Sequence, residues 1–506
     1  MGFYLGSEVY PPPMTFPEYD TLDATAMAAL VSAGQVSPAE LLEAAVERIE
    51  ARNPELNAIV DTFYDKARAE SDSLPDGPFK GVPFLLKDLK AQLAGTVTTN
   101  STALRTGVVS TQTSVLVQRY QAAGVQILGK TNTPEFGIMG ITEPRTRGAA
   151  RNPWNLEHTP GGSSGGSGSA VAARMVPMAH GGDGGGSIRI PASCCGLFGL
   201  KPTRGRNTMA PFMGDAWGGF VQEHVLTHSV RDCAAMLDLT AIPTPGEPYG
   251  IAPPARPWLQ EVGADPGKLR VAFTTDTLHA GETDPACKAA VLDAAKLLEA
   301  LGHEVVEAAP VYPKEAMIQA YFRTVCAGIA WYVDQAAHDA GRAPSPGDFE
   351  PSTWLMAQIG WATTAPELQD SIYEMQQVNR TMAAFHADYD VMLSSTMAKP
   401  PAKIGELYPN SGDHAQMALL RVLGFKSLLD FTIKKLGTDT MAWTPNTQLF
   451  NQTGQPAASL PLFEHEGLPI GVQLSTAFGD EATLFRLSSQ LEEARPWAGK
   501  RPPSLG

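Results

Sequence analysis

Hydrophobic positions along the chain follow two alternating patterns, one typical of amphipathic helices and one typical of buried strands. After the capping box Ser37-Pro38-Ala39-Glu40, the segment LLEAAVERIEAR carries apolar side chains at helical spacing. Short continuous apolar runs predict buried strands at 58–63, 80–86 and 125–130. Strands that alternate with helices predict an α/β layered fold.

The same alternation continues toward the C-terminus. We expect further strands at 269–274, 303–308, 391–395 and within the segment GLPIGVQL, and further helices at 285–301, 314–341, 366–387 and 481–494. Residues 342–365 show no clear period and are predicted to form a loop. We expect an extended arm at 1–20 and one large domain at 21–500, with a variable, substrate-covering region at about 240–440.

A glycine- and serine-rich stretch, Thr159–Pro191, interrupts this pattern. Its first cluster is GGSSGG (161–166) and its second is GGGS (184–187), and the apolar run 170–179 between them predicts a helical turn and a buried strand. Glycine lets backbone N–H groups approach a ligand closely and adopt positive φ. A row of such groups that ends in serine predicts a nucleophile, Ser187, with an oxyanion hole from the amides of Gly184, Gly185, Gly186 and Ser187.

Three other interpretations of this stretch were weighed. A flexible linker would not enclose the apolar run AVAARMVPMA. A phosphate-binding loop needs Gly-Lys-Ser/Thr or a GxGxxG motif, and neither is present. A Ser-His-Asp site would use His180 and Asp183, but Ile188 and Arg189 follow Ser187, so no Gly-x-Ser-x-Gly elbow exists. We interpret His180 as a packed strand-end residue, and Asp183 with Arg189 as an ion pair that supports the loop.

The stretch closely resembles the signature segment of the amidase signature family of serine hydrolases. Upstream, GVPFLLKD (81–88) matches the lysine segment of that family, and GLFGLKPT (196–203) matches its usual continuation. The resemblance runs from about Thr25 to the C-terminal helix. It implies the amidase signature fold, a large mixed twisted β-sheet covered by helices on both faces. It also implies a catalytic triad of Ser187, Ser163 and Lys87, with a cis peptide bond before Ser163.

These implied roles set chemical requirements. Lys87 must be neutral to act as a base, and its place at the end of the apolar run VPFLL predicts a buried side chain. Ser163 would pass protons between Ser187 and Lys87, and Ser164 is expected to have a supporting hydrogen-bonding role. The implied reaction is amide hydrolysis through an acyl-enzyme.

Within the family, the segments TEPRTRGAARNPWNLEHTPGGSSGGS and HGGDGGGSIRIPASCCGL look most like the branch of nylon-oligomer hydrolases and aryl acylamidases. We therefore expect neutral, bulky, aryl or cyclic amides as substrates, with carbamates and urethanes as further candidates. The expected pocket residues are Ile138, Met139, Cys326 and Trp331. The alternative is a glutamine amidase subunit of a tRNA amidotransferase-like complex. A binding protein without catalysis is disfavoured, because all three triad residues are present.

Composition and net charge indicate which kinds of binding partner are expected for this protein. The 506 residues carry a net charge of −15, which argues against nucleic acid binding. No apolar run approaches the ~18–20 residues of a membrane-spanning helix. Five scattered cysteines, with no secretory signal pattern at the N-terminus, predict reduced thiols and a cytoplasmic location. No metal and no cofactor are expected. The expected partners are a small-molecule amide and, at most, a second copy of the chain as a homodimer.

Overall fold

The computed structural model describes residues 16–408 and 441–503. Within these residues, one 11-stranded mixed sheet forms the centre, with the order β1-β3-β2-β4-β6-β5-β10-β11-β9-β7-β8. The strands are β1 Ile59–Thr62, β2 Pro83–Lys87, β3 Gln126–Thr131, β4 Met178–Asp183, β5 Phe198–Lys201, β6 Gln222–Thr227, β7 Arg270–Phe273, β8 Glu304–Glu307, β9 Val391–Ser395, β10 Ala457–His465 and β11 Leu468–Thr476.

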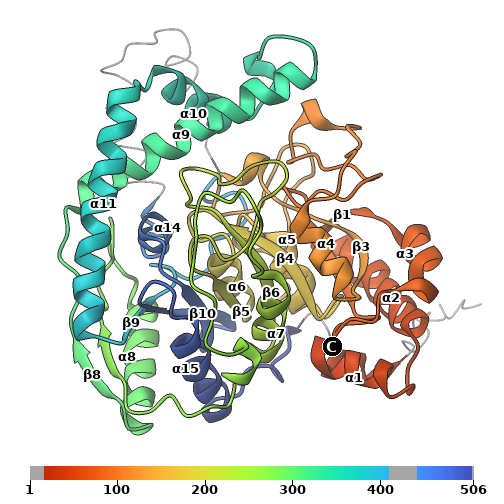
Figure 1. Ribbon diagram of the computed structural model, residues 1–506, viewed down its shortest axis with the longest axis horizontal. Coiled ribbons are helices and arrows are strands. Elements are labelled where there is room, and N and C mark those ends of the chain that lie inside the picture. Colours follow the sequence, from red (N-terminus) through yellow and green to blue (C-terminus); the bar gives the residue numbers. More distant parts are fainter. Residues whose placement is uncertain (1–15, 409–440, 504–506) are drawn as a thin grey trace, which may run out of the picture.

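Helices surround this sheet (Figure 1). The α-helices are α1 Ala24–Ser32, α2 Pro38–Leu56, α3 Tyr64–Glu70, α4 Val115–Ala122, α5 Gly165–Ala172, α6 Arg189–Cys195, α7 Val230–Thr240, α8 Pro285–Ala300, α9 Lys314–Asp339, α10 Pro351–Ala362, α11 Ala365–Asp388, α14 Gln448–Thr453 and α15 Glu481–Ala494. The 3-10 helices are η1 Pro17–Thr21, η2 Ser71–Ser73, η3 Ala103–Arg105, η4 Glu135–Gly137, η5 Trp258–Gln260 and η6 Pro346–Asp348.

Strand β11 shows how both faces of the sheet are covered. Successive strand residues point to opposite faces. Ile470, Val472 and Leu474 pack in the apolar cluster that includes residues of α8 and α15. On the other face, the Gly471 amide bonds Ser193 of α6 and the Gln473 side chain bonds Arg189 of the same helix. The predicted fold, a mixed α/β sheet between helices, is confirmed.

Local signals in the sequence account for several of these elements. The predicted capping box is present, since Ser37 Oγ accepts a hydrogen bond from the Glu40 amide while the Glu40 carboxylate accepts one from the Ser37 amide. The strand predicted at 391–395 has those bounds, and the helix predicted at 285–301 differs from α8 by one residue.

Two segments differ from expectation. The predicted loop at 342–365 contains α10, which packs on α9. Every residue from Thr353 to Ala357 is buried, so the segment shows no helical period of apolar and polar residues. Residues 1–15 of the expected arm lie outside the described residues. The end of that arm is a 3-10 helix rather than an extended segment, because Tyr19 is buried and donates a hydrogen bond to the Met175 carbonyl.

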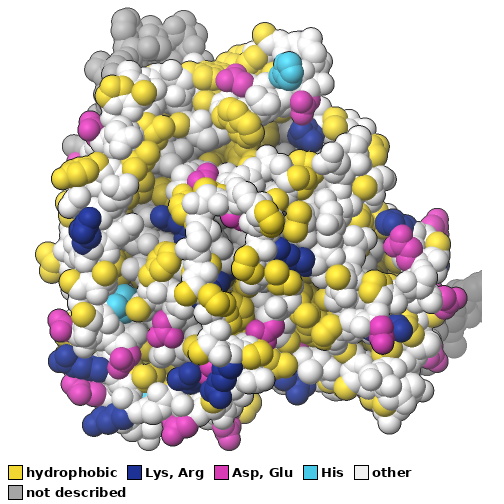
Figure 2. Space-filling view, viewed as in Figure 1, with side chains coloured by type: hydrophobic (Ala, Val, Ile, Leu, Met, Phe, Trp, Pro, Cys, Tyr) yellow, Lys and Arg dark blue, Asp and Glu magenta, His cyan; other side chains and the backbone are white. Residues whose placement is uncertain are grey.

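Parallel pairing places the site. Strands β2 and β4 run parallel, so their carboxyl ends meet at one edge of the sheet, with Lys87 ending β2 and Asp183 ending β4. Helices α9, α10 and α11 lie together at the upper left of Figure 1, away from α1–α3 at the lower right. In Figure 2 the same face is hollowed beneath α9 and α10, where hydrophobic side chains gather.

Candidate active site

Lys87 is the centre of the candidate site. Its side chain is almost fully buried, at 1% exposure. Its Nζ lies 2.8 Å from Ser163 Oγ, 3.0 Å from Ser164 Oγ and 3.3 Å from the Gly182 carbonyl oxygen. Both serines predicted in the first glycine cluster therefore lie within hydrogen-bonding distance of the lysine.

Burial dominates the electrostatics of this lysine. It lowers the pKa of Lys87 to about 7, against the opposing negative charges of Glu223 and Asp183, and the positive charge of Lys90 acts in the same direction as burial. Near neutral pH a large fraction of Lys87 is thus a neutral amine, which can accept a proton from a neighbouring hydroxyl.

The first glycine cluster presents its two serines differently. The Gly162–Ser163 peptide bond is cis, as the resemblance implies. Ser164 Oγ also lies 3.3 Å from both the amide and the carbonyl oxygen of Gly182. Ser164 therefore connects Lys87 to the end of β4, a placement that fits the supporting role expected for it.

Ser187 follows the second glycine cluster. At 9% exposure it is more accessible than Ser163 at 2% or Ser164 at 0%. Gly186 has a φ of +124°, and the Gly186 carbonyl accepts a hydrogen bond from the Ile190 amide. Because a trans peptide holds its C=O and N–H antiparallel, the Ser187 N–H points away from α6.

One predicted oxyanion donor is already engaged. The Gly186 amide donates to Asp183 Oδ1 at 2.7 Å, so it is not available to a substrate oxygen. The Asp183 side chain accepts this hydrogen bond from within the loop, and the row of glycines in the sequence gives no sign of that contact. For the amides of Gly184, Gly185 and Ser187, the described residues contain no hydrogen-bond acceptor.

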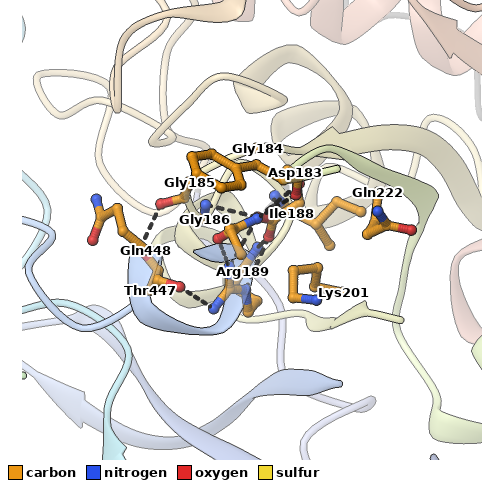
Figure 3. A network of polar contacts seen from close by, with 12 residues as sticks. Asp183, Gly184, Gly185, Gly186, Ile188, Arg189, Lys201, Gln222, Thr447 and Gln448 are labelled. Atoms are coloured by element: carbon orange, nitrogen blue, oxygen red, sulfur yellow. Dashed lines mark hydrogen bonds and ion pairs between the residues drawn. The ribbon is translucent and has the colours of Figure 1, made fainter. Parts of the chain in front are cut away.

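The expected ion pair between Asp183 and Arg189 is present beneath the loop, as Figure 3 shows. Both side chains are fully buried, and Arg189 Nη2 lies 2.9 Å from Asp183 Oδ1. Burial alone would raise the pKa of Asp183, but the charge and hydrogen bonds of Arg189 outweigh it and lower that pKa well below the usual range. Asp183 is therefore a charged anchor for the loop rather than a proton donor.

Several functional contacts were missed by sequence reasoning. Thr447 Oγ1 donates to the Gly185 carbonyl at 2.6 Å, and Asn451 Nδ2 donates to the Asp183 carboxylate at 2.8 Å. Tyr321, from the region that we expected to cover the substrate, also reaches this loop, and its Oη lies 3.4 Å from the Gly184 carbonyl oxygen. The resemblance to the amidase family runs through this part of the chain, but none of the motifs quoted for it includes Thr447 or Asn451.

A cavity of about 340 Å³ is lined by the segment that follows β2, by His180 of β4, by Glu223 of β6 and by residues of α9. Lys87 and the serines of the candidate site are not among its lining residues. Of the predicted pocket residues, Trp331 lines it, together with Phe136 and Tyr332. Ile138 and Met139 are half-buried and lie outside its lining. Cys326 is fully buried in the core between α9 and α10, because it faces the neighbouring helix, and it does not line this cavity.

The described residues contain no group of three His, Cys, Asp or Glu side chains placed to hold a metal ion. None of their helices combines the length and apolar character needed to cross a bilayer.

Comparisons with known proteins agree with this geometry. A family model described as Amidase matches residues 40–485. The chain is 39% identical over 494 residues to the 6-aminohexanoate-cyclic-dimer hydrolase of Paenarthrobacter ureafaciens, covering 96% of this chain and 97% of that protein.

Solved structures give the same relationship. A structure of 6-aminohexanoate cyclic dimer hydrolase superposes with a TM-score of 0.86 at 38% identity, covering 96% of this chain and 99% of the other. A bacterial aryl acylamidase gives a TM-score of 0.83 at 25% identity, covering 95% and 99%. The chain therefore belongs to the amidase signature family, and it is an amidase, a hydrolase of carbon–nitrogen bonds.

Proposed function

We propose that Ser187, Ser163 and Lys87 form the catalytic triad of this amidase. The observation that carries the proposal is the buried contact of 2.8 Å between Lys87 Nζ and Ser163 Oγ, with a lysine pKa lowered to about 7. Ser187 Oγ attacks the amide carbonyl carbon. Its proton passes to Ser163, while the Ser163 proton passes to the neutral Lys87 amine.

The second half of the reaction returns these protons. The amide C–N bond breaks, and the leaving amine takes a proton through Ser163 from the Lys87 ammonium group. A water molecule then attacks the acyl-enzyme ester and passes a proton through Ser163 to Lys87. The acyl C–O bond breaks, the proton returns through Ser163 to Ser187 Oγ, and the acid is released. The N–H groups of Ser187, Gly185 and Gly184 are the candidate donors to the oxyanion, in place of the engaged Gly186.

For the substrate, we propose neutral, bulky, aryl or cyclic amides, with carbamates as further candidates. Similarity to the cyclic-dimer hydrolase along 96% of the chain supports this class. The aromatic side chains of Phe136, Trp331 and Tyr332 on the cavity wall also support it. Burial of apolar substrate surface against such a wall contributes about 25 cal/mol of binding free energy for each Å2.

Steady-state kinetics test the substrate class. We expect the purified chain to hydrolyse a cyclic aminohexanoate amide or an aryl acylamide with a kcat/KM above that for glutamine. An aryl carbamate in the same panel tests the carbamate extension. A kcat/KM for glutamine above all the others would contradict the proposal and favour the amidotransferase-subunit alternative.

A further inference from the structure

Two ionisable side chains that the triad does not use lie directly behind Lys87. His180 belongs to β4 and Glu223 to β6, which pairs antiparallel with β4. Gly182 is the cross-strand partner of Glu223 and lies two residues from His180, so both side chains are on one face of the sheet. An added Cβ at Gly182 would lie 2.5 Å from Glu223 Oε1, so the carboxylate lies over the residue whose carbonyl contacts Lys87 Nζ.

His180 holds the backbone of the lysine. The ladder between β2 and β4 ends with the pair Leu85–Ala179, and beyond it the Lys87 amide donates a hydrogen bond to His180 Nδ1 at 3.3 Å. A side chain thus continues the ladder where the backbone pairing between β2 and β4 ends. The ring is fully buried, so it can hold one orientation there.

This contact determines the protonation of the ring. A backbone N–H can only donate, so Nδ1 must carry the lone pair and the proton of the neutral imidazole must be on Nε2. Nε2 lies 2.7 Å from Glu223 Oε2, in a contact bent away from the N–H direction. His180 therefore bridges the Lys87 backbone and the Glu223 carboxylate.

Glu223 supplies a buried negative charge beside the ring. Burial would raise the pKa of this carboxyl, but the interaction with His180 and the positive charges of Lys90 and Lys87 outweigh burial and lower it. The charged groups that act on the Lys87 ammonium are Glu223 from β6, Asp183 from β4 and Lys90 from the segment after β2. Because Arg189 neutralises Asp183, Glu223 is the acid whose charge is least compensated.

Lys90 lines the same cavity as His180 and Glu223. Lys90 Nζ donates a hydrogen bond to the Tyr332 hydroxyl at 2.7 Å, which fixes its position. Its positive charge and the negative charge of Glu223 act on the pKa of Lys87 in opposite directions.

We propose that His180 and Glu223 are positioning residues for the catalytic lysine. His180 fixes the Lys87 backbone at the end of β2, and Glu223 orients the imidazole and places a negative charge near the lysine ammonium group. This inference rests on the proposed role of Lys87 as the base.

The charge of Glu223 is tested by the pH dependence of kcat/KM with the amide that the wild type hydrolyses fastest. Removing the negative charge destabilises the protonated lysine, so Glu223→Gln shifts the acid limb to lower pH by about one unit. Lys90→Met removes a positive charge and shifts the limb to higher pH. Glu481→Gln is the matched control, because Glu481 is equally buried but is paired with the distant Arg206, and its limb stays in place.

The backbone contact is tested by two substitutions of one residue. Asparagine places Oδ1 where His180 has Nδ1, whereas leucine keeps the bulk and loses the acceptor. We expect His180→Leu to lose about tenfold to hundredfold in kcat through misplacement of Lys87, and His180→Asn to recover most of that loss. His224→Leu is the control, since His224 is fully buried on the same strand as Glu223 but bonds the Cys233 carbonyl.

The outcomes separate this inference from the proposed triad. If Lys87→Met keeps wild-type activity, the triad itself is refuted. If Lys87→Met is inactive but the acid limb of the Glu223→Gln profile stays at the wild-type pH or moves to higher pH, only the positioning inference fails. Equal kcat values for His180→Leu and His180→Asn would also overturn it. If Glu223→Gln does not fold, the pH profile of Lys90→Met still tests the inference. An acid limb of that variant at the wild-type pH or at a lower pH would contradict the proposed effect of these charges on Lys87.

Discussion

At the scale of single residues, the candidate site assigns different environments to three serines that look alike in sequence. Ser163 and Ser164 both contact Lys87 Nζ, but Ser164 also contacts the Gly182 backbone and is fully buried. Ser187 is the most exposed of the three and follows the glycine loop. Accessibility to substrate therefore favours Ser187 as the nucleophile of the proposed triad, in which Ser163 is the proposed proton relay to Lys87.

This assignment predicts a graded set of losses. Ser187→Ala is expected to lower kcat by about 10⁴-fold or more, and Ser163→Ala and Lys87→Met by several orders of magnitude, because residues that act as one unit fail together. Ser164→Ala is expected to stay within about tenfold of the wild type. Single-turnover kinetics on each variant measure these losses. An inactive Ser164→Ala beside an active Ser163→Ala would reverse the two roles.

The pKa of Lys87 predicts the pH dependence of the wild-type enzyme. A base must be unprotonated, so activity is low below a pKa of about 7 and rises as the pH passes through it. We expect kcat/KM to fall about tenfold per pH unit below that value, because each unit changes the neutral fraction tenfold. A profile of kcat/KM from pH 5 to pH 9 measures it. An acid limb near pH 4 would indicate a carboxylate base instead.

At the scale of elements, the sequence predicted those that carry a clear period or a local signal. The capping box of α2, the strand β9 and the long helix α9 are examples. Helix α10 was not predicted, because burial of every residue from Thr353 to Ala357 leaves no amphipathic pattern.

The candidate site shows the same division. The proposed triad follows from motifs, but the Gly186–Asp183 contact and the position of Glu223 near Lys87 depend on how distant parts of the chain pack. Similarly, the burial of Cys326 depends on the packing of α10, a helix that the sequence analysis did not predict.

Close packing of α10 on α9 gives a prediction at this scale. A Cβ at Gly360 would lie 2.1 Å from the Cys326 carbonyl oxygen, a backbone atom that no rotamer change can move. We expect Gly360→Ala to lower the free energy of unfolding by about 1–3 kcal/mol through overpacking, despite a gain of about 1 kcal/mol in helix propensity. Chemical denaturation measures the change. Gly347→Ala is the control, because nothing lies within 4 Å of a Cβ there; equal stabilities of the two variants would contradict the packing.

At the scale of the whole molecule, one buried cation connects elements from distant parts of the chain. Arg189 of α6 bonds Asp183 at the end of β4, Asn451 of α14 and Gln473 of β11. It also bonds the Thr447 carbonyl, whose residue holds the Gly185 carbonyl through its hydroxyl. The glycine loop 184–187 is thus held by residues of the C-terminal segment as well as by residues adjacent to it in sequence.

This network predicts a non-additive response to substitution. Arg189→Met leaves the Asp183 carboxylate buried without its cation, which typically costs about 3–5 kcal/mol. The double variant Asp183→Asn with Arg189→Met removes both charges, so we expect it to be more stable than Arg189→Met alone. Its activity should stay low, because the carboxamide introduced by Asp183→Asn has one acceptor oxygen, whereas the carboxylate accepts from both the loop and the helix.

Denaturant unfolding and kcat, measured on both single variants and on the double variant, give the coupling between the two residues. Arg342→Met is the control, since Arg342 is 47% exposed and solvent screens its pair with Asp348, so its removal should change the stability little. Strictly additive losses from Asp183 and Arg189 would mean that the pair is not a coupled buried unit. A double variant with wild-type kcat would mean that the loop keeps its catalytic shape without this connection to the C-terminal segment.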